Sequence, residues 1–121
     1  MKTFRDLRVW QHAHDLVLQV YRLTQTFPNH ELYGLSSQLR RAAVSVPANI
    51  VEGFTRKGNK DFSRFLNVAQ GSLEETKYFL LLAKDLDYLP SASFDKLQAQ
   101  ADTVGKMLHG LMTKVSAKKP D

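Results

Sequence analysis

The fold of this chain is decided by residues 36–73, SSQLRRAAVSVPANIVEGFTRKGNKDFSRFLNVAQGSL. The first half repeats apolar residues at steps of three and four, which is typical of a helix with one buried face. Pro47 interrupts that pattern and should kink the helix, because its ring removes one backbone hydrogen bond. Gly58 then favours a helix end, and Asn59 is a good N-cap for another helix. The stretch therefore predicts two helices joined by a short basic turn.

The same periodicity continues on both sides of this stretch. Apolar spacing predicts helices over about residues 6–27, 35–54, 60–86 and 93–115, with Asp6 as the cap of the first. The last helix has the cleanest pattern, a heptad seam formed by Phe94, Leu97, Ala101, Val104, Leu108, Leu111 and Val115. Long helices with short connections favour one all-α domain over residues 1–121, an antiparallel, up-down-up-down four-helix bundle.

The third helix carries features that its own apolar stripe does not explain. Phe79, Leu81 and Leu82 add apolar groups on other faces, so this end is either buried on more than one side or paired with another subunit. Gly71 lies in the middle of the helix, where glycine costs about 1 kcal/mol relative to alanine. We expect Gly71 to permit the close approach of another backbone.

Composition and motifs exclude several classes of protein. The chain has no cysteine, which excludes a disulfide framework and a thiolate metal site. The N-terminal residues are broken by charge, unlike a signal peptide, and no apolar run approaches the roughly 20 residues of a membrane span. The four histidines show no metal-binding spacing, and no glycine-rich phosphate loop or GxSxG elbow is present. We therefore expect a cytoplasmic protein that is not an enzyme, with no metal, no cofactor and no membrane partner.

Positive charge is concentrated in the central stretch. The net charge is +5, from 17 basic and 12 acidic residues, and residues 36–66 alone carry six basic and two acidic side chains. An up-down-up-down bundle would gather further cations at the same end. We call this set the basic pole: Lys2, Arg5, Arg8, Arg56, Lys57, Lys60, Arg64, Lys114, Lys118 and Lys119. The acidic residues expected at the opposite end are Glu31, Asp85, Asp87 and Asp95.

A concentrated cationic end can attract an acidic partner or a phosphate backbone. The candidate nucleic-acid-binding residues are Arg56, Lys57, Lys60, Arg64, Lys118 and Lys119. The alternative is that these side chains form only a solvated helix end. Phe54, Phe62 and Phe65 lie among the cations but fit the core stripe, so we do not expect them to stack on bases.

Four polar residues of the second helix admit two interpretations each. Asn49 and Glu52 are three apart and can share a helix face, as a polar site or as a buried hydrogen-bonded pair that fixes helix register. Arg40 and Arg41 either bind phosphate or have structural roles. In the structural interpretation one arginine is solvated, and the other pairs with an acidic group across the bundle or a subunit interface. We favour the structural interpretation for all four residues.

The sequence also resembles a known family. Residues 36–86, SSQLRRAAVSVPANIVEGFTRKGNKDFSRFLNVAQGSLEETKYFLLLAKDL, closely resemble four-helix-bundle proteins encoded by intervening sequences of bacterial large-subunit ribosomal RNA genes. The opening FRDLRVWQHAHDLVLQVY resembles their first helix, and the segment Arg-Arg-Ala…Pro-x-Asn-Ile-x-Glu-Gly is highly specific to them. A related branch comprises accessory proteins of diversity-generating retroelements, which bind a reverse transcriptase and nucleic acid through a basic surface. The resemblance implies a four-helix bundle, a ring-like homo-pentamer and no catalytic residues.

Two functions are compatible with these observations. The first is a non-enzymatic, oligomeric helical bundle that binds RNA or DNA, or a nucleoprotein such as a reverse-transcriptase complex, through the basic pole. The second is a structural or protein–protein interaction module without a nucleic-acid role, in which the charge serves subunit pairing. A steep salt dependence of nucleic-acid binding would favour the first.

Overall fold

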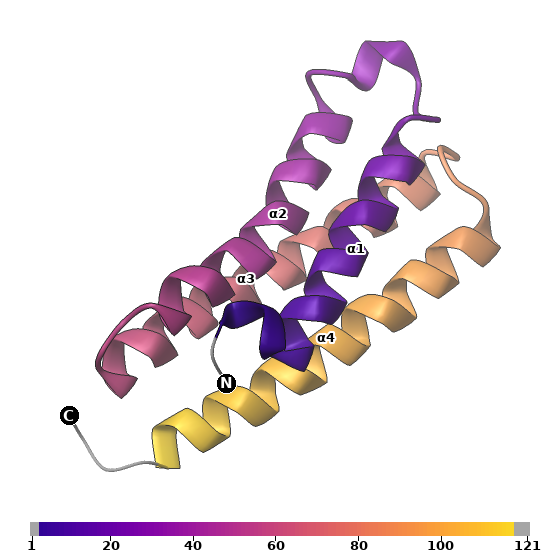
Figure 1. The fold of residues 1–121 in the computed structure, drawn as a ribbon. Helices are drawn as coiled ribbons and strands as arrows, with labels where there is room; N and C mark the ends of the chain where they lie inside the picture. The colour runs from indigo at the N-terminus through magenta and orange to yellow at the C-terminus, as the bar shows by residue number, and fades with distance from the viewer. Residues whose placement is uncertain (1–2, 118–121) are drawn as a thin grey trace.

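The computed structural model describes residues 3–117, which fold into four helices lying side by side (Figure 1). The helices are α1, Arg8–Thr24; α2, Leu35–Phe54; α3, Asn59–Asp85; and α4, Ser91–Ala117. Two short 3-10 turns, η1 at Phe4–Asp6 and η2 at Asn29–Glu31, precede α1 and α2, and residues 3–117 contain no strand. The predicted all-helical bundle of four helices is confirmed.

The first helix is shorter than its sequence pattern predicts. Asp6 caps the preceding turn instead of α1: its carboxylate accepts from the Thr3 backbone N–H at 3.1 Å, while the Thr3 hydroxyl accepts from the Arg5 N–H at 3.1 Å. Leu7 is then extended, and α1 begins at Arg8. The helix ends at Thr24, because the chain turns so that Phe27 is buried against the Tyr88 ring, 5.5 Å away between centroids.

The core contains the apolar stripes that the sequence predicts. The predicted heptad of α4 is buried apart from Leu111, which is half-buried. The side chains with almost no exposed surface come from all four helices: Leu16, Val20, Leu39, Val46, Ile50, Leu66, Leu73, Thr76, Leu80, Val104 and Leu108. Pro47 is also buried, and α2 continues through it as one helix.

Two glycines have opposite surroundings. A Cβ at Gly53 would lie 2.8 Å from Cδ1 of Phe62 and 3.0 Å from Cβ of Phe65, so glycine permits the close contact between α2 and α3. At Gly71 the prediction of a close approach is wrong for a single chain. Apart from its chain neighbours and the adjacent backbone of α3, no atom of the described residues lies within 4 Å of a Cβ built there, and the residue is exposed.

Polar contacts join the helices and turns at the end of the molecule opposite the α2–α3 turn. The Tyr88 hydroxyl, from the α3–α4 turn, donates to Glu31 at 2.8 Å, and the Leu35 backbone N–H donates to the same carboxylate at 3.0 Å. The Leu35 hydrogen bond, followed by the Tyr88 hydrogen bond, lowers the pKa of Glu31 below its usual value. The Glu31 hydrogen bond raises the pKa of Tyr88. Farther along the bundle, Lys77 of α3 joins Asp102 of α4 at 3.0 Å.

The extra apolar residues of α3 are only partly covered within one chain. Phe79 and Leu82 are half-buried against the core, whereas Leu81 is 40 % exposed and Tyr78 is 57 % exposed. Burial on more than one side is therefore not achieved within the described chain, and pairing with another subunit stays a prediction. No helix within residues 3–117 is long and apolar enough to cross a membrane.

Candidate nucleic-acid interface

The α2–α3 turn is a short, well-anchored connection. α2 ends at Phe54 and α3 begins at Asn59, with Gly58 in an extended conformation just before it. The Phe54 and Phe62 rings meet edge to face beneath the turn, with centroids 6.4 Å apart. Asn59 is the first residue of α3 and Gly58 occupies the N-cap position, which corrects the prediction of Asn59 as its cap. The turn is held by the packing of the two phenylalanine rings beneath it.

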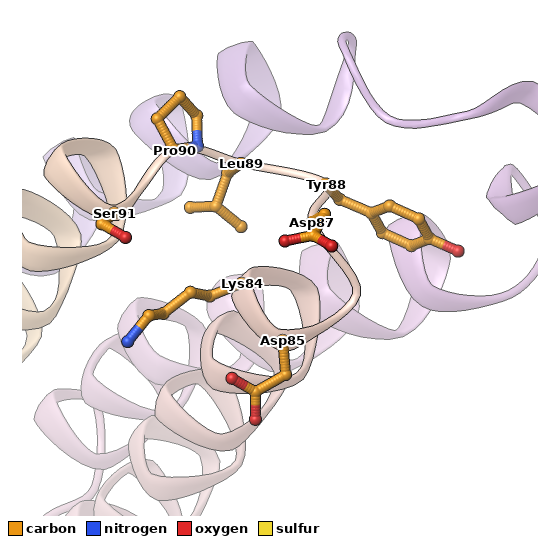
Figure 2. A pocket seen from close by; sticks show the side chains of 7 residues that line it. All are labelled: Lys84, Asp85, Asp87, Tyr88, Leu89, Pro90 and Ser91. Carbon is orange, nitrogen blue, oxygen red and sulfur yellow. The ribbon is translucent and has the colours of Figure 1, made fainter.

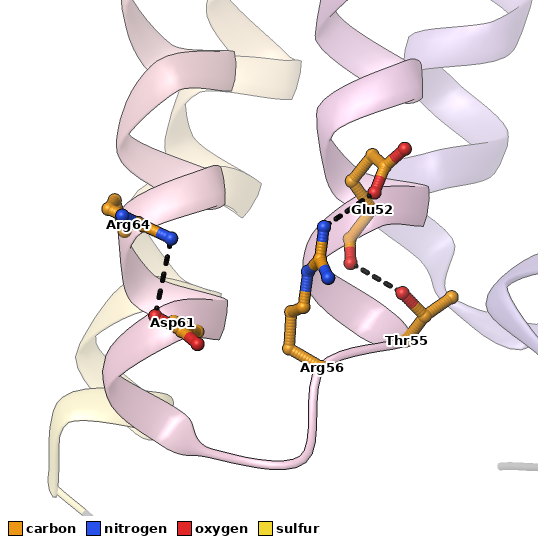
Figure 3. A network of polar contacts seen from close by, with 5 residues as sticks. All are labelled: Glu52, Thr55, Arg56, Asp61 and Arg64. Atoms are coloured by element: carbon orange, nitrogen blue, oxygen red, sulfur yellow. Dashed lines mark hydrogen bonds and ion pairs between the residues drawn. The ribbon is translucent and has the colours of Figure 1, made fainter.

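Two arginines at the turn form ion pairs with carboxylates that lie three or four residues away in the sequence. Nη2 of Arg56 lies 3.0 Å from Oε2 of Glu52, and Nη2 of Arg64 lies 3.3 Å from Oδ1 of Asp61 (Figure 3). The side chains are 43 % exposed in Arg56 and 70 % exposed in Arg64. Ion pairs in such exposed positions contribute about 0.2–1 kcal/mol each, because solvent screens them. The guanidinium groups therefore remain open to exchange their partners.

A single phenylalanine ring brings these two arginines together. The Arg56 guanidinium carbon lies 4.7 Å from the centroid of the Phe65 ring, and the Arg64 guanidinium carbon lies 5.6 Å from it. Both distances are within the range in which a cation is attracted to an aromatic face. Phe65 thus contacts one cation from the turn and one from α3, so that the two charges meet at one spot.

Lysines complete the cationic surface of the turn. Lys57 and Lys60 are both exposed. Together with Arg56 and Arg64 they form a group that we call the four turn cations, accompanied by the two carboxylates of Glu52 and Asp61. Four of the six predicted nucleic-acid-binding residues therefore lie at one turn. The other two, Lys118 and Lys119, lie outside the described residues, as does Lys2 of the basic pole.

The three other described cations of the basic pole, Arg5, Arg8 and Lys114, come from η1, α1 and α4. Arg8, at the start of α1, and Lys114, in the last turns of α4, line one recess. Figure 1 shows the start of α1 set back from the end of the molecule that carries the α2–α3 turn and the end of α4. Arg5 and Arg8 therefore flank that end instead of sitting at its tip, because α1 is a shorter helix of 17 residues.

Arg40 and Arg41 have separate surroundings. Nε of Arg40 donates to the hydroxyl of buried Thr24 at 2.6 Å, and the guanidinium lies over the Tyr21 ring at 4.8 Å. The prediction of an acidic partner for one arginine is not met at Arg40, because a hydroxyl and an aromatic ring occupy that place. Arg41 is exposed and lines a groove between α2 and α3.

Asn49 and Glu52 do not form the predicted buried pair. The Asn49 amide donates to the Ser45 backbone carbonyl at 2.7 Å and to the Ser45 hydroxyl at 3.0 Å. Glu52 is exposed and turned toward Arg56, one helical turn further on. The register contact between α2 and α3 is made by the Ser45 and Ser72 hydroxyls at 2.8 Å, which the sequence analysis missed. The signal was the four-residue spacing of Arg41, Ser45 and Asn49 along one face of α2.

A recess lies at the end of the bundle opposite the α2–α3 turn. Its charged side chains have both signs, unlike the four turn cations. It is formed at the α3–α4 turn by Lys84, Asp85, Asp87, Tyr88, Leu89, Pro90 and Ser91 (Figure 2). Lys84 extends over the Phe94 ring at 4.7 Å. Asp87 adopts a positive φ of 62°, which aspartate tolerates better than most residues. Within residues 3–117 there is no group of three or more histidine or acidic side chains that could hold a metal ion.

Fold and surface together define a four-helix bundle with cations gathered at one interhelical turn. Residues 5–110 match the family model described as 23S rRNA-intervening sequence protein. The chain therefore belongs to the 23S rRNA-intervening sequence protein family. A crystal structure of a protein of unknown function from the S23 ribosomal protein family of Bacteroides thetaiotaomicron has the same fold, with a TM-score of 0.80 and 22 % identity, covering 86 % of this chain and 97 % of that one. No curated protein matches the chain.

Proposed function

We propose that this protein is a non-enzymatic, oligomeric helical bundle that binds RNA or DNA, alone or within a nucleoprotein, through the basic pole. The observation that carries the proposal is the gathering of the four turn cations at one short connection and the start of the helix that follows it. Guanidinium groups suit phosphate because their N–H donors form a planar fork that matches its oxygens. The positive end of the α3 helix dipole lies on the same side and favours an anion there.

The expected binding has little sequence preference. Arginine and lysine contacts to phosphate position a nucleic acid without distinguishing its bases. The aromatic residues at the turn do not supply base recognition either. Phe54, Phe62 and Phe65 are half-buried and are engaged with each other or with the two arginines. Affinity should therefore fall steeply with salt, because each phosphate that is neutralised releases counterions.

Assembly into a homo-pentamer would multiply the site. We propose that the chain is an antiparallel, up-down-up-down bundle, which is supported by the contacts of Lys77 with Asp102 and of Lys84 with Phe94. The exposed apolar side chains of α3 support pairing between subunits. A ring would repeat the four turn cations, so that weak sites act together on one strand by avidity. Light scattering at several concentrations tests this assembly, and a monomer at micromolar concentration would refute it.

A charge-reversal experiment tests the nucleic-acid function. The wild type is compared with Arg56→Glu/Lys57→Glu by fluorescence anisotropy, using a labelled single-stranded RNA and the matching DNA at about 50 mM and about 200 mM salt. The matched control is Lys96→Glu/Lys106→Glu, which changes the net charge equally on exposed positions of α4. We expect strong weakening only in the turn variant. Equal affinities of all three proteins, or no binding by the wild type, would refute the function.

A second candidate function, protein–protein interaction, is favoured by a different surface. The groove between α2 and α3 has a volume of about 620 Å³ and carries Arg41 and Glu75 on its two helices. At its rim the side chain of Tyr33 is 92 % exposed, which is unusual for a large aromatic group. Salt-insensitive capture of one protein, lost in Tyr33→Ala and retained in Arg56→Glu/Lys57→Glu, would favour this function over nucleic-acid binding.

A further inference from the structure

The two carboxylates at the α2–α3 turn occupy donors that a phosphate would need. Glu52 accepts from Arg56, and Asp61 pairs with Arg64, each within one helical turn of its partner (Figure 3). Among the six charged side chains at this turn, these are the only negative ones, and both face an arginine. We infer that Glu52 and Asp61 act as internal competitors, which hold the guanidinium groups in the free protein and are displaced by the phosphates of a nucleic acid. This inference rests on the proposed function.

The geometry keeps both arginines ready for exchange. Besides its carboxylate, each guanidinium also contacts the Phe65 ring, with the two guanidinium carbons 4.7 and 5.6 Å from the ring centroid. A guanidinium has five N–H donors, so one ion pair leaves several donors available to an incoming oxygen. When a phosphate takes over Nη2, the displaced carboxylate turns to solvent, since both carboxylate side chains are 57 % exposed. The cost of exchange is therefore small, and the ring keeps each arginine near its position.

The arrangement has a consequence for selectivity. A single phosphate gains only one of the two arginines and leaves the other paired with its own carboxylate. A strand with successive phosphates can engage both arginines, and both carboxylates then turn to solvent. The internal competitors therefore weaken the binding of isolated anions more than they weaken the binding of a polyanion. They set the affinity of the basic pole without contributing to the packing of the bundle.

The test neutralises the competitors while keeping their shape. Glu52→Gln/Asp61→Asn is compared with the wild type by anisotropy on a labelled single-stranded RNA of mixed sequence at about 50 mM and about 200 mM salt. Release of two exposed ion pairs should tighten binding by about 2- to 30-fold. The matched control is Asp85→Asn/Asp95→Asn, which makes the same change in net charge near the α3–α4 turn. Asp85 lies about 36 Å along α3 from Asp61, far beyond the Debye length of about 8–10 Å, so this control should bind like the wild type.

A second comparison separates competition from plain repulsion between carboxylate and phosphate. The same two neutralising substitutions are made in Arg56→Ala/Arg64→Ala, where no guanidinium remains to be released. Competition predicts that most of the gain disappears in that background, whereas direct repulsion predicts the same gain with or without the arginines. Circular dichroism melts of all variants verify that each is folded. The single substitutions Glu52→Gln and Asp61→Asn provide the same comparison for each helix separately.

The outcomes distinguish this inference from the proposed function. A wild type that binds RNA, with a neutralised variant that binds more tightly only when the arginines are present, supports the inference. A wild type that binds with an affinity unchanged by Glu52→Gln/Asp61→Asn overturns the inference and leaves the proposed function standing. A gain that persists equally in Arg56→Ala/Arg64→Ala also overturns it. If neither the wild type nor the neutralised variant binds at about 50 mM salt, the proposed function fails together with the inference.

Discussion

The contact between α2 and α3 depends on one missing side chain, and Gly53→Ala should therefore destabilise the protein. A Cβ at this position would lie 2.8 Å from Cδ1 of Phe62, 3.0 Å from Cβ of Phe65 and 3.2 Å from the Phe62 carbonyl oxygen. The Phe65 Cβ and the Phe62 carbonyl oxygen cannot rotate away, so the helices must separate. Overpacking of this kind costs about 1–3 kcal/mol. The better helix propensity of alanine offsets about 1 kcal/mol at most, and less near the end of α2.

The net loss of about 1–2 kcal/mol corresponds to a fall in melting temperature of about 4–8 °C for a chain of this length. Gly110→Ala is the control, because a Cβ built there meets no atom of the described residues within 4 Å apart from its chain neighbours and the adjacent backbone of α4. That substitution lies within α4 and should raise the melting temperature by up to about 4 °C. Thermal melts by circular dichroism measure both effects. If Gly53→Ala melts at or above the wild-type temperature, the close approach of α2 and α3 is not what requires glycine.

Three further outcomes are expected. Leu108→Ala should lower the free energy of unfolding by about 2–5 kcal/mol because Leu108 is fully buried, whereas Lys114→Ala should change it little; equal effects in urea titrations would refute the orientation of α4. Glu31 has a lowered pKa, so its carboxylate stabilises the fold above pH 4.5 and this stabilisation is lost as the pH falls. The difference in melting temperature between wild type and Glu31→Gln should therefore narrow at acidic pH, and a gap that stays constant would contradict the hydrogen bonds of Glu31. Tyr88 has a raised pKa, so the Tyr88 hydroxyl stabilises the fold below pH 10.0 and this stabilisation is lost as the pH rises through the raised pKa. The difference in melting temperature between wild type and Tyr88→Phe should therefore narrow at alkaline pH, and a difference in melting temperature that does not change with pH would contradict the hydrogen bond to Glu31.

Helix identity was predictable because it depends on a long, repeated pattern. The apolar stripe of α2 and the heptad of α4 repeat over five or more turns. If either helix turned another face toward the core, many apolar side chains would be exposed to water. The ends of α1 were less predictable, since they depend on single interactions. The reciprocal bonds of Thr3 and Asp6 form a 3-10 turn before α1, and Phe27 leaves the helix to meet a tyrosine from a distant turn. Local sequence carries no signal for a partner that lies 61 residues away.

The partners of exposed polar residues were the hardest to predict. Asn49 and Glu52 share a helix face, yet each has a nearer partner: a serine one turn before it and an arginine one turn after it. Gly71 illustrates the same difficulty, because glycine inside a helix indicates a close approach only if some neighbour comes near. The clustering of the four turn cations was predictable, since it follows from the order of residues along one short connection. Their ion pairs and their shared aromatic ring required the structure.

Phe65 joins the stability of the fold to the proposed function of its surface. The ring lies beside the Gly53 contact between α2 and α3, and it also carries the two guanidinium groups of Arg56 and Arg64. Loss of the arginines leaves the ring in its packing position, so binding and stability should separate in Arg56→Ala/Arg64→Ala. Loss of the ring removes both the packing contact and the common support of the arginines. Because Arg56 and Arg64 share the ring of Phe65, the charged surface lies directly beside the close contact between α2 and α3.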